Sequence, residues 1–335
     1  MKNIFALCSL LFALFISCGQ KPAENSESFG ASTSPTSERI GRAFNADSAF
    51  SFVQKQVDFG PRVPNTEAHR KCAEFLVSAL ERFGAKVTLQ KTDLTAFDGT
   101  ILHAQNIIAS FNPDAKERIL LMAHWDSRPF ADQDPRPDNH RKPVTGANDG
   151  ASGVGVLLEI ARLTGQPDTE ALEASRGIDI IFFDAEDYGA PAWTNNFNEN
   201  TWCLGSQYWA QNPHTENYSA KFGILLDMVG AANAVFLQEQ YSMYYAPAIV
   251  EKVWKAAQQA CFGHFFKSQP GGAITDDHLY VNHFAGIPSI DIIDFDPRRP
   301  QGFPNAWHTT YDTMRNIDRE TLRAVGQTIL IIINE

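Results

Sequence analysis

Two adjacent acids, Glu186 and Asp187, follow a strongly apolar segment at residues 178–184. The segment is rich in β-branched and aromatic residues, which is typical of a strand buried on both faces of a parallel sheet. Ligands of open α/β sheets bind at the carboxyl ends of the strands, so we expect these acids at a functional edge. Because adjacent residues leaving a strand point in different directions, one acid can bind a metal ion while the other transfers protons.

Further candidate metal ligands follow other apolar segments or the loops after them. They are His124 and Asp126 after residues 119–123, Asp149 before a helical pattern, Asp227 after residues 224–226, and His308 beyond the last strand. One His and two carboxylates with an open position form a familiar catalytic zinc set. Taken singly, Asp149 could cap a helix, and a lone His is more often a surface or core residue. Their recurrence at strand ends predicts a metal site.

The elements that must position these residues alternate along the chain. Strands are expected at residues 86–90, 106–111, 118–123, 178–184, 221–229 and 287–293, and helices at 45–57, 150–163, 247–261 and 318–333. This alternation predicts an α/β fold, a single domain with a central mixed, mostly parallel β-sheet flanked by helices on both faces. Loops at 127–145, 189–201 and 295–306 interrupt the pattern, and long loops often build sites.

Two helix starts carry capping signals. Asn45 or Asp47 can cap the first helix, and Asn65 can cap a second one after the turn-rich Phe59-Gly60-Pro61-Arg62 segment. Gly84 is expected to end that second helix.

The N-terminus predicts export and a membrane tether. Lys2 precedes an apolar core at residues 4–16 that is too short to span a bilayer, and small residues flank Cys18. This pattern resembles a bacterial lipoprotein signal. We therefore expect a signal peptide at 1–17, a lipid-anchored disordered linker at 18–44 and a zinc-dependent catalytic domain at 45–335. The expected location is the cell envelope, in the periplasm or at the outer membrane.

Composition narrows the class of partner. The net charge is −11, with 44% hydrophobic and 20% charged residues, so a soluble globular protein is expected and nucleic acid is an improbable partner. The acidity can serve solubility, or a pocket that accepts a cationic amine. Cys72, Cys203 and Cys261 show no metal-ligand spacing, and which two of them could form a disulfide stays open.

The candidate residues together carry a family resemblance. The order His124-x-Asp126, Gly146-Ala147-x-Asp149, Glu186-Asp187, Asp227, His308 resembles the zinc aminopeptidase-type α/β fold. Within that clan the chain is most similar to the glutaminyl-peptide cyclotransferases. The motifs that carry this similarity are Phe303-Pro304-x-x-Trp307-His308-Thr309, Asp276-Asp277-His278 and the long insertion between His124 and Asp149.

The resemblance implies one zinc ion held by Asp149, Asp187 and His308. It implies Glu186 as general acid/base, a carboxylate network of Asp227 and Asp276, and a substrate pocket walled by Trp307, Phe303 and Trp193. The implied substrates are peptides or proteins with N-terminal glutamine, which are converted to pyroglutamate with release of ammonia. Two features depart from the animal enzymes: Ala123 and Val154 replace a cysteine pair, and Asp291 stands where those enzymes have a His.

Two other functions are compatible with parts of the pattern. In a two-zinc aminopeptidase, His124 and Asp227 would hold a second metal bridged to the first by Asp149. Trp307 argues against that function, because an indole beside the metal narrows the room for a longer peptide. A non-catalytic binding lipoprotein would not need Glu186 and a full ligand set.

Overall fold

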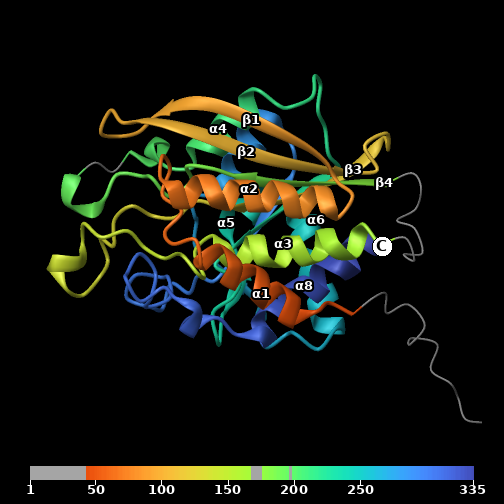
Figure 1. Cartoon of the computed structure of the whole chain (residues 1–335). Helices are drawn as coiled ribbons and strands as arrows, with labels where there is room; N and C mark the ends of the chain where they lie inside the picture. Colours follow the sequence, from red (N-terminus) through yellow and green to blue (C-terminus); the bar gives the residue numbers. More distant parts are fainter. Residues whose placement is uncertain (1–42, 167–175, 196–197) are drawn as a thin grey trace, which may run out of the picture. The chain divides into compact units, whose positions relative to one another are not determined.

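A computed structural model describes residues 43–166, 176–195 and 198–335 and shows a layered α/β arrangement around one central sheet (Figure 1). The sheet has six strands in the order β1-β2-β4-β3-β5-β8. The strands are β1 (Lys86–Thr95), β2 (Ile101–Phe111), β3 (Glu117–His124), β4 (Arg176–Phe183), β5 (Phe222–Asp227) and β8 (Ser289–Ile293). β1, β2 and β4 pair antiparallel, whereas β4, β3, β5 and β8 pair parallel. The expected mixed, mostly parallel sheet is confirmed.

Helices cover both faces of the sheet. One face packs against α1 (Ala46–Val57), α2 (Glu67–Arg82), α3 (Ala151–Thr164), α6 (Pro247–Gln259) and α8 (Arg319–Asn334). The other face packs against α4 (Leu204–Gln211) and a π-helical turn (Val281–Ala285) that continues the short α7 (Asp277–Tyr280). α5 (Gln240–Tyr245) and a two-stranded parallel sheet of β6 (Phe236–Gln238) and β7 (Phe266–Pro270) complete the set. Figure 1 shows α1, α2, α3 and α8 grouped on one side.

The parallel strands are buried on both faces, as the apolar runs predict. In β3, Ile119 and Leu121 belong to one hydrophobic cluster, while Leu120 and Met122 belong to the cluster on the opposite face. This division follows from the two-residue period of a strand. The buried parallel strands therefore hold the strand ends that carry the candidate site.

The second helix begins differently from the prediction. Asn65 has φ 71° and does not cap α2; its side-chain amide donates to the Ile101 carbonyl and accepts from the His103 amide. Thr66 is the cap instead, and its hydroxyl accepts a hydrogen bond from the His69 amide at 3.2 Å. The Asn65 side chain is therefore hydrogen-bonded to the backbone of β2 and does not bond the first turn of α2. At the other end Gly84, with φ 86°, follows the helix as expected.

The predicted signal peptide at 1–17, Cys18 and nearly all of the linker at 18–44 lie outside the described residues. Phe44 is already buried, and its amide donates to the Gln327 side chain at 2.9 Å. None of the helices in the described part of the chain has the length and apolar character needed to cross a membrane. Cys72, Cys203 and Cys261 are all free thiols, so none of them pairs with another.

Candidate active site

The candidate residues converge at one edge of the sheet because their strands run parallel. His124 ends β3, Glu186 and Asp187 follow β4, and Asp227 ends β5. Asp149 lies directly before Gly150, the N-cap residue of α3, and the Asp149 side chain does not cap that helix. Gly150 has φ 69°, and a Cβ atom there would lie 2.7 Å from the His124 ring. Glycine is therefore needed for Asp149 and His124 to come together.

Asp149, Asp187 and His308 form a buried ligand set. One donor atom from each lies within 4.8 Å of the others, and His308 Nε2 is 3.5 Å from Asp149 Oδ2 and 3.2 Å from Asp187 Oδ1. Asp187 Oδ1 is buried without a hydrogen-bond partner among the described residues. Two crowded carboxylates, one of them with a bare oxygen, and one imidazole match a catalytic zinc set. The residues present fit a zinc ion.

The protonation of this set also suits a metal ion. Burial, followed by the charge of Arg128, lowers the pKa of His308 to about 3, which keeps the imidazole in its neutral, ligating form. Burial, followed by the charge of Asp149, raises the pKa of Asp187 well above its usual value. A cation between the two carboxylates would relieve this repulsion.

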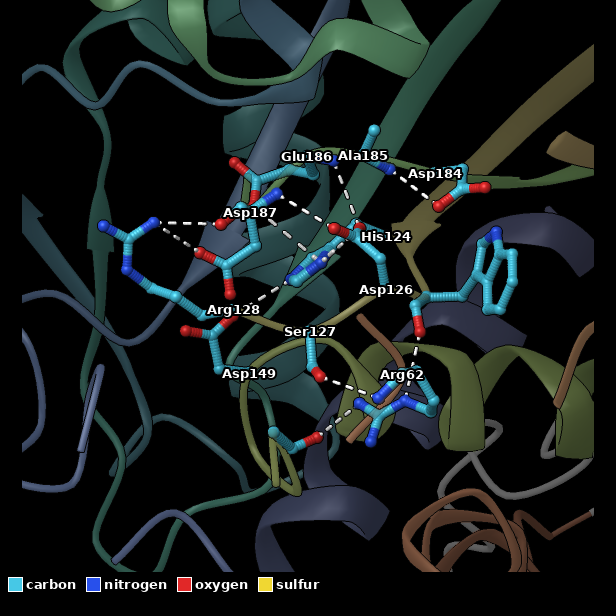
Figure 2. A network of polar contacts seen from close by, with 12 residues as sticks. Arg62, His124, Asp126, Ser127, Arg128, Asp149, Asp184, Ala185, Glu186 and Asp187 are labelled. Carbon is cyan, nitrogen blue, oxygen red and sulfur yellow. Dashed lines mark hydrogen bonds and ion pairs between the residues drawn. The ribbon is translucent and has the colours of Figure 1, made fainter. Parts of the chain in front are cut away.

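Asp126 and Asp312 fix the backbone on which the ligands stand. Asp126 accepts the amides of Glu186 and Asp187, both at 3.1 Å (Figure 2). Asp312 accepts the amide of Asp149 at 3.1 Å. Asp126 also lies beside the His124 ring, with its Oδ1 3.4 Å from Nδ1.

Arg128 and Asp132 extend the set outward. Arg128 is fully buried; it donates to the Asp187 carbonyl at 2.9 Å, and its Nη1 lies 3.6 Å from Asp187 Oδ1. It also donates to both oxygens of Asp132, at 2.7 and 2.9 Å. Asp132 Oδ1 in turn lies 3.6 Å from His308 Nδ1. Such outer carboxylates orient ligating imidazoles.

Arg62 explains the turn-rich motif near the N-terminus. Its guanidinium is fully buried and donates to the carbonyls of Trp125, Thr145 and Gly146 at 3.1, 2.6 and 2.7 Å (Figure 2). These carbonyls belong to the segments that follow β3 and precede α3. Arg62 therefore ties together the two segments that carry His124 and Asp149.

A second cluster joins His124, Asp149 and Asp227. His124 Nε2 lies 3.1 Å from Asp149 Oδ1 and 3.2 Å from Asp227 Oδ1. Burial lowers the pKa of His124, but hydrogen bonds with Asp126, Asp149 and Asp227 outweigh it and raise the pKa well above its usual value. The donor atoms required for a second metal ion are thus close together, as in the aminopeptidase alternative.

Glu186 belongs to neither of these ligand sets, although its Oε2 lies 3.8 Å from His124 Nδ1. Its Oε1 accepts a hydrogen bond from the Cys203 thiol at 3.3 Å. Burial raises its pKa well above the usual value; His124 opposes this shift, whereas Asp187, Asp276 and Asp277 add to it. A carboxyl group with a raised pKa can both accept and return a proton near neutral pH.

A cavity of about 340 Å³ opens onto these residues. Residues that line it are Asp149, Glu186, Asp187, Trp202, Asp227, Asp276, Phe303, Trp307 and His308. The Trp307 ring stacks on His308 with centroids 3.8 Å apart and packs on Phe303 at 4.3 Å. The lining of the cavity therefore combines a packed aromatic group with several acidic side chains.

The structure does not place Trp193 in this cavity lining. Trp193 is 37% exposed and packs edge-on against Phe130, with ring centroids 5.3 Å apart. Trp202 lines the cavity instead, parallel to the His308 ring at 5.7 Å and under the Arg128 guanidinium at 4.4 Å. Trp193 lies within the predicted loop 189–201, and Trp202 follows that loop directly. Their spacing alone could not predict which of the two lines the cavity.

Four non-glycine residues at the site have left-handed backbone conformations. They are Ala185, Cys203, Met228 and His308, with φ between 49° and 56°. Each is a functional residue or the neighbour of one. Left-handed backbone in residues with a side chain costs energy and concentrates at functional sites.

Sequence reasoning missed Arg128, Asp132, Trp202 and Cys203 as parts of the site. The Arg128 and Asp132 pair follows His124-x-Asp126 within the 127–145 loop, where a buried ion pair at i,i+4 spacing was the available signal. Cys203 gave no signal, because its contact with Glu186 depends on how the 189–201 loop returns to β4.

Comparisons with known proteins agree with this geometry. The profile of peptidase family M28 matches residues 106–333. A glutaminyl cyclase from Bacteroides thetaiotaomicron bound to N-acetylhistamine is 56% identical, with 88% of this chain and 99% of that chain covered and a TM-score of 0.84. A Zn-dependent exopeptidase from Parabacteroides distasonis is 57% identical, with 88% and 99% covered and a TM-score of 0.85.

More distant relatives are similar over a smaller share. The glutaminyl-peptide cyclotransferase of Bothrops jararaca is 24% identical over 69% of this chain and 65% of that protein. The chain thus spans just under two thirds of the length of that curated relative.

Proposed function

The chain belongs to peptidase family M28, and we propose that within this family it is a zinc-dependent glutaminyl cyclase. It converts the N-terminal glutamine of peptides or proteins to pyroglutamate and releases ammonia. The similarity to bacterial glutaminyl cyclases at 50–56% identity supports this activity.

The observation that carries the proposal is that Trp307 and Glu186 line the same cavity as the metal-ligand set. Trp307 stacks on the ligand His308 and gives a flat apolar wall, which suits a small ring. Glu186 lies among other acidic side chains in the cavity lining, and their negative charge favours binding of an amine. An N-terminal glutamine has both an α-amine and a side-chain amide. We expect it to bind with the amide at the metal-ligand set and the amine near Glu186.

The reaction needs orientation and proton transfer more than a new nucleophile. The substrate's own α-amine attacks its γ-amide carbon, so a C–N bond forms, the bond to the leaving nitrogen breaks, and ammonia departs. Asp149, Asp187 and His308 would hold the zinc ion, which when bound polarises the amide carbonyl as a Lewis acid. Glu186 accepts the proton that the attacking amine loses and delivers it to the leaving nitrogen.

Asp227 and Asp276 support Glu186 from the same cavity. Burial raises the pKa of Asp227 to about 8, with hydrogen bonding from His124 opposing and the charge of Asp149 adding to the shift. Burial also raises the pKa of Asp276. The negative charge of Asp276 in turn adds to the raised pKa of Glu186.

We propose one zinc ion at the Asp149, Asp187 and His308 set. His124 Nε2 lies 3.1 Å from Asp149 Oδ1 and 3.2 Å from Asp227 Oδ1, so the imidazole itself is a hydrogen-bonding partner for the carboxylates where a second ion would otherwise bind. In an aminopeptidase the same donor atoms would hold a second zinc. Zinc content of the purified protein separates the two arrangements.

One assay tests the activity directly. The protein is incubated with a Gln-initiated peptide, and ammonia release and the mass loss of one ammonia are followed with and without a chelator. Cyclisation that the chelator abolishes is the expected result. Release of free amino acids with two zinc ions per chain would instead establish the aminopeptidase function.

The envelope location is a separate proposal that rests on the sequence. We propose that the chain is anchored through lipidated Cys18 after removal of residues 1–17. In a bacterial host, the mature protein should partition into detergent and Cys18→Ala should not. Equal partitioning of both proteins would refute the anchor.

A further inference from the structure

A third group of donor atoms lies beside the proposed zinc ligands and shares none of them. One donor atom each from Glu186, Cys203 and Asp276 lies within 4.8 Å of the others. We propose that these three residues form a second, inhibitory site for a thiolate-binding divalent cation such as Zn²⁺. The inhibitory consequence, though not the binding, rests on the proposed role of Glu186.

The fold holds Cys203 firmly against Glu186. Cys203 precedes α4 with a left-handed φ of 56°, and its amide donates to the Glu186 carbonyl at 2.9 Å. The next amide, that of Leu204, donates to the Ala185 carbonyl at 3.0 Å. These two backbone bonds place a fully buried thiol 3.3 Å from Glu186 Oε1. The thiol is thus a built part of the site and not a surface cysteine.

Asp276 gives an independent indication of a missing partner. Its Oδ1 accepts the Asp277 amide at 2.6 Å, but its buried Oδ2 receives no hydrogen bond from an N–H group among the described residues, and the side chain that contacts Asp276 is another buried acid, Asp291. The residue is only 4% exposed. A buried carboxylate oxygen without a partner is costly, and a cation is one way to satisfy it.

The donor set selects the kind of cation. Thiolate ligands favour zinc and similar soft or borderline ions, whereas Mg²⁺ and Ca²⁺ prefer oxygen alone. Glu186 and Asp276 line the cavity, so a cation can reach them from the substrate side. Binding would displace the Cys203 thiol proton, which is released to solvent.

A cation at this site would occupy the carboxylate that must carry the reaction's proton. Zinc beyond the first equivalent should therefore inhibit cyclisation while the first ion remains in place. The site limits activity when zinc is abundant, without any change in the fold.

Cobalt substitution tests the site without using activity. The metal-free enzyme is titrated with Co²⁺, and thiolate-to-cobalt charge-transfer absorption is recorded. The first equivalent should bind without this absorption, because its ligands are two carboxylates and an imidazole, and the second should produce it. The absorption should disappear in Cys203→Ser, weaken in Asp276→Asn and persist in Cys261→Ser, which removes an exposed thiol.

Zinc inhibition supplies the second readout. Cys203→Ser should need about tenfold more zinc for half-inhibition of its own activity than Cys261→Ser does, as expected when one ligand is lost. A second equivalent that binds without charge-transfer absorption, or absorption that survives in Cys203→Ser, overturns the proposal. If the absorption appears but no Gln-initiated peptide is cyclised, the proposed function fails and the metal site stands.

Discussion

Replacing Asp132 with asparagine tests whether the outer residues control the metal ligand His308. The Asp132 side chain is only 3% exposed. It accepts two hydrogen bonds from Arg128 and lies 3.6 Å from His308 Nδ1. Burial raises the pKa of Asp132, but the hydrogen bonds and charge of Arg128 outweigh it and lower the pKa. Asparagine keeps the shape of the side chain and removes its charge.

Two losses are expected from Asp132→Asn. Removing one partner of a buried ion pair costs about 3–5 kcal/mol, and we expect the lower end because Arg128 keeps the carbonyls of Asp187 and Gly189. Loss of the carboxylate behind a ligating imidazole lowers metal affinity about 10- to 100-fold, or about 1.4–2.7 kcal/mol. The first loss applies to the metal-free protein and the second to zinc binding.

The two losses are measured separately and compared with a matched control. Denaturant unfolding of the metal-free protein reports stability, and competition with a chromophoric chelator reports zinc affinity. Asp179→Asn is the control, since Asp179 lies within β4 and accepts two hydrogen bonds from Arg118, at 2.5 and 2.7 Å, besides those from Ser110 and Tyr218. The control should lose stability and keep its zinc affinity. If Asp132→Asn binds zinc within about twofold of Asp179→Asn, the orienting role assigned to Asp132 is wrong.

Four further predictions concern the reaction, the metal and pH. Glu186→Gln should lower kcat about 100- to 10,000-fold while zinc content stays unchanged, and unchanged turnover would refute the proton-transfer role. Chelation should abolish activity and lower Tm, with both restored by zinc; at free zinc 1,000 times its Kd the ion adds about 4 kcal/mol of stability. Burial, with the charge of Asp149, raises the pKa of Asp312 from 3.8 to about 7 in the folded state. The stability that this shift contributes is complete below pH 3.8 and is lost as pH rises to 7, so the metal-free wild type should lose more stability between pH 4 and 7 than Asp312→Asn. Trp307→Leu should raise KM for a Gln-initiated peptide about tenfold, whereas Trp193→Leu should change it less than about twofold; equal effects would contradict the cavity lining described above.

The sheet and the strand-end ligands could be predicted because each leaves a strong local signal. The composition of residues 178–184 alone predicts a strand that is buried on both faces. Acids directly after that strand must then lie at the edge of the sheet. Short elements such as α5 (Gln240–Tyr245) and β7 (Phe266–Pro270) escaped prediction. Both are too short for periodicity to distinguish, and they are held by contacts with distant parts of the chain.

The parts of the site that sequence could not give depend on long-range geometry. Asn65 has the side chain of a helix cap, yet hydrogen bonds to β2 claim it and leave the capping to Thr66. Trp193 and Trp202 are chemically alike, and the path of the intervening loop decides which of them reaches His308. Cys203 reaches Glu186 through a backbone conformation that propensity would not assign to cysteine.

The left-handed residues around the cavity have a consequence for protein engineering. Ala185, with φ 54°, would be among the first positions that a search for thermostable variants replaces with glycine, since relief of that conformation is worth about 1 kcal/mol. The same replacement would free the peptide that aims Glu186 and Asp187, whose amides are held by Asp126. Selection for heat resistance should therefore favour glycine at position 185, whereas selection for turnover should favour the alanine that this chain has.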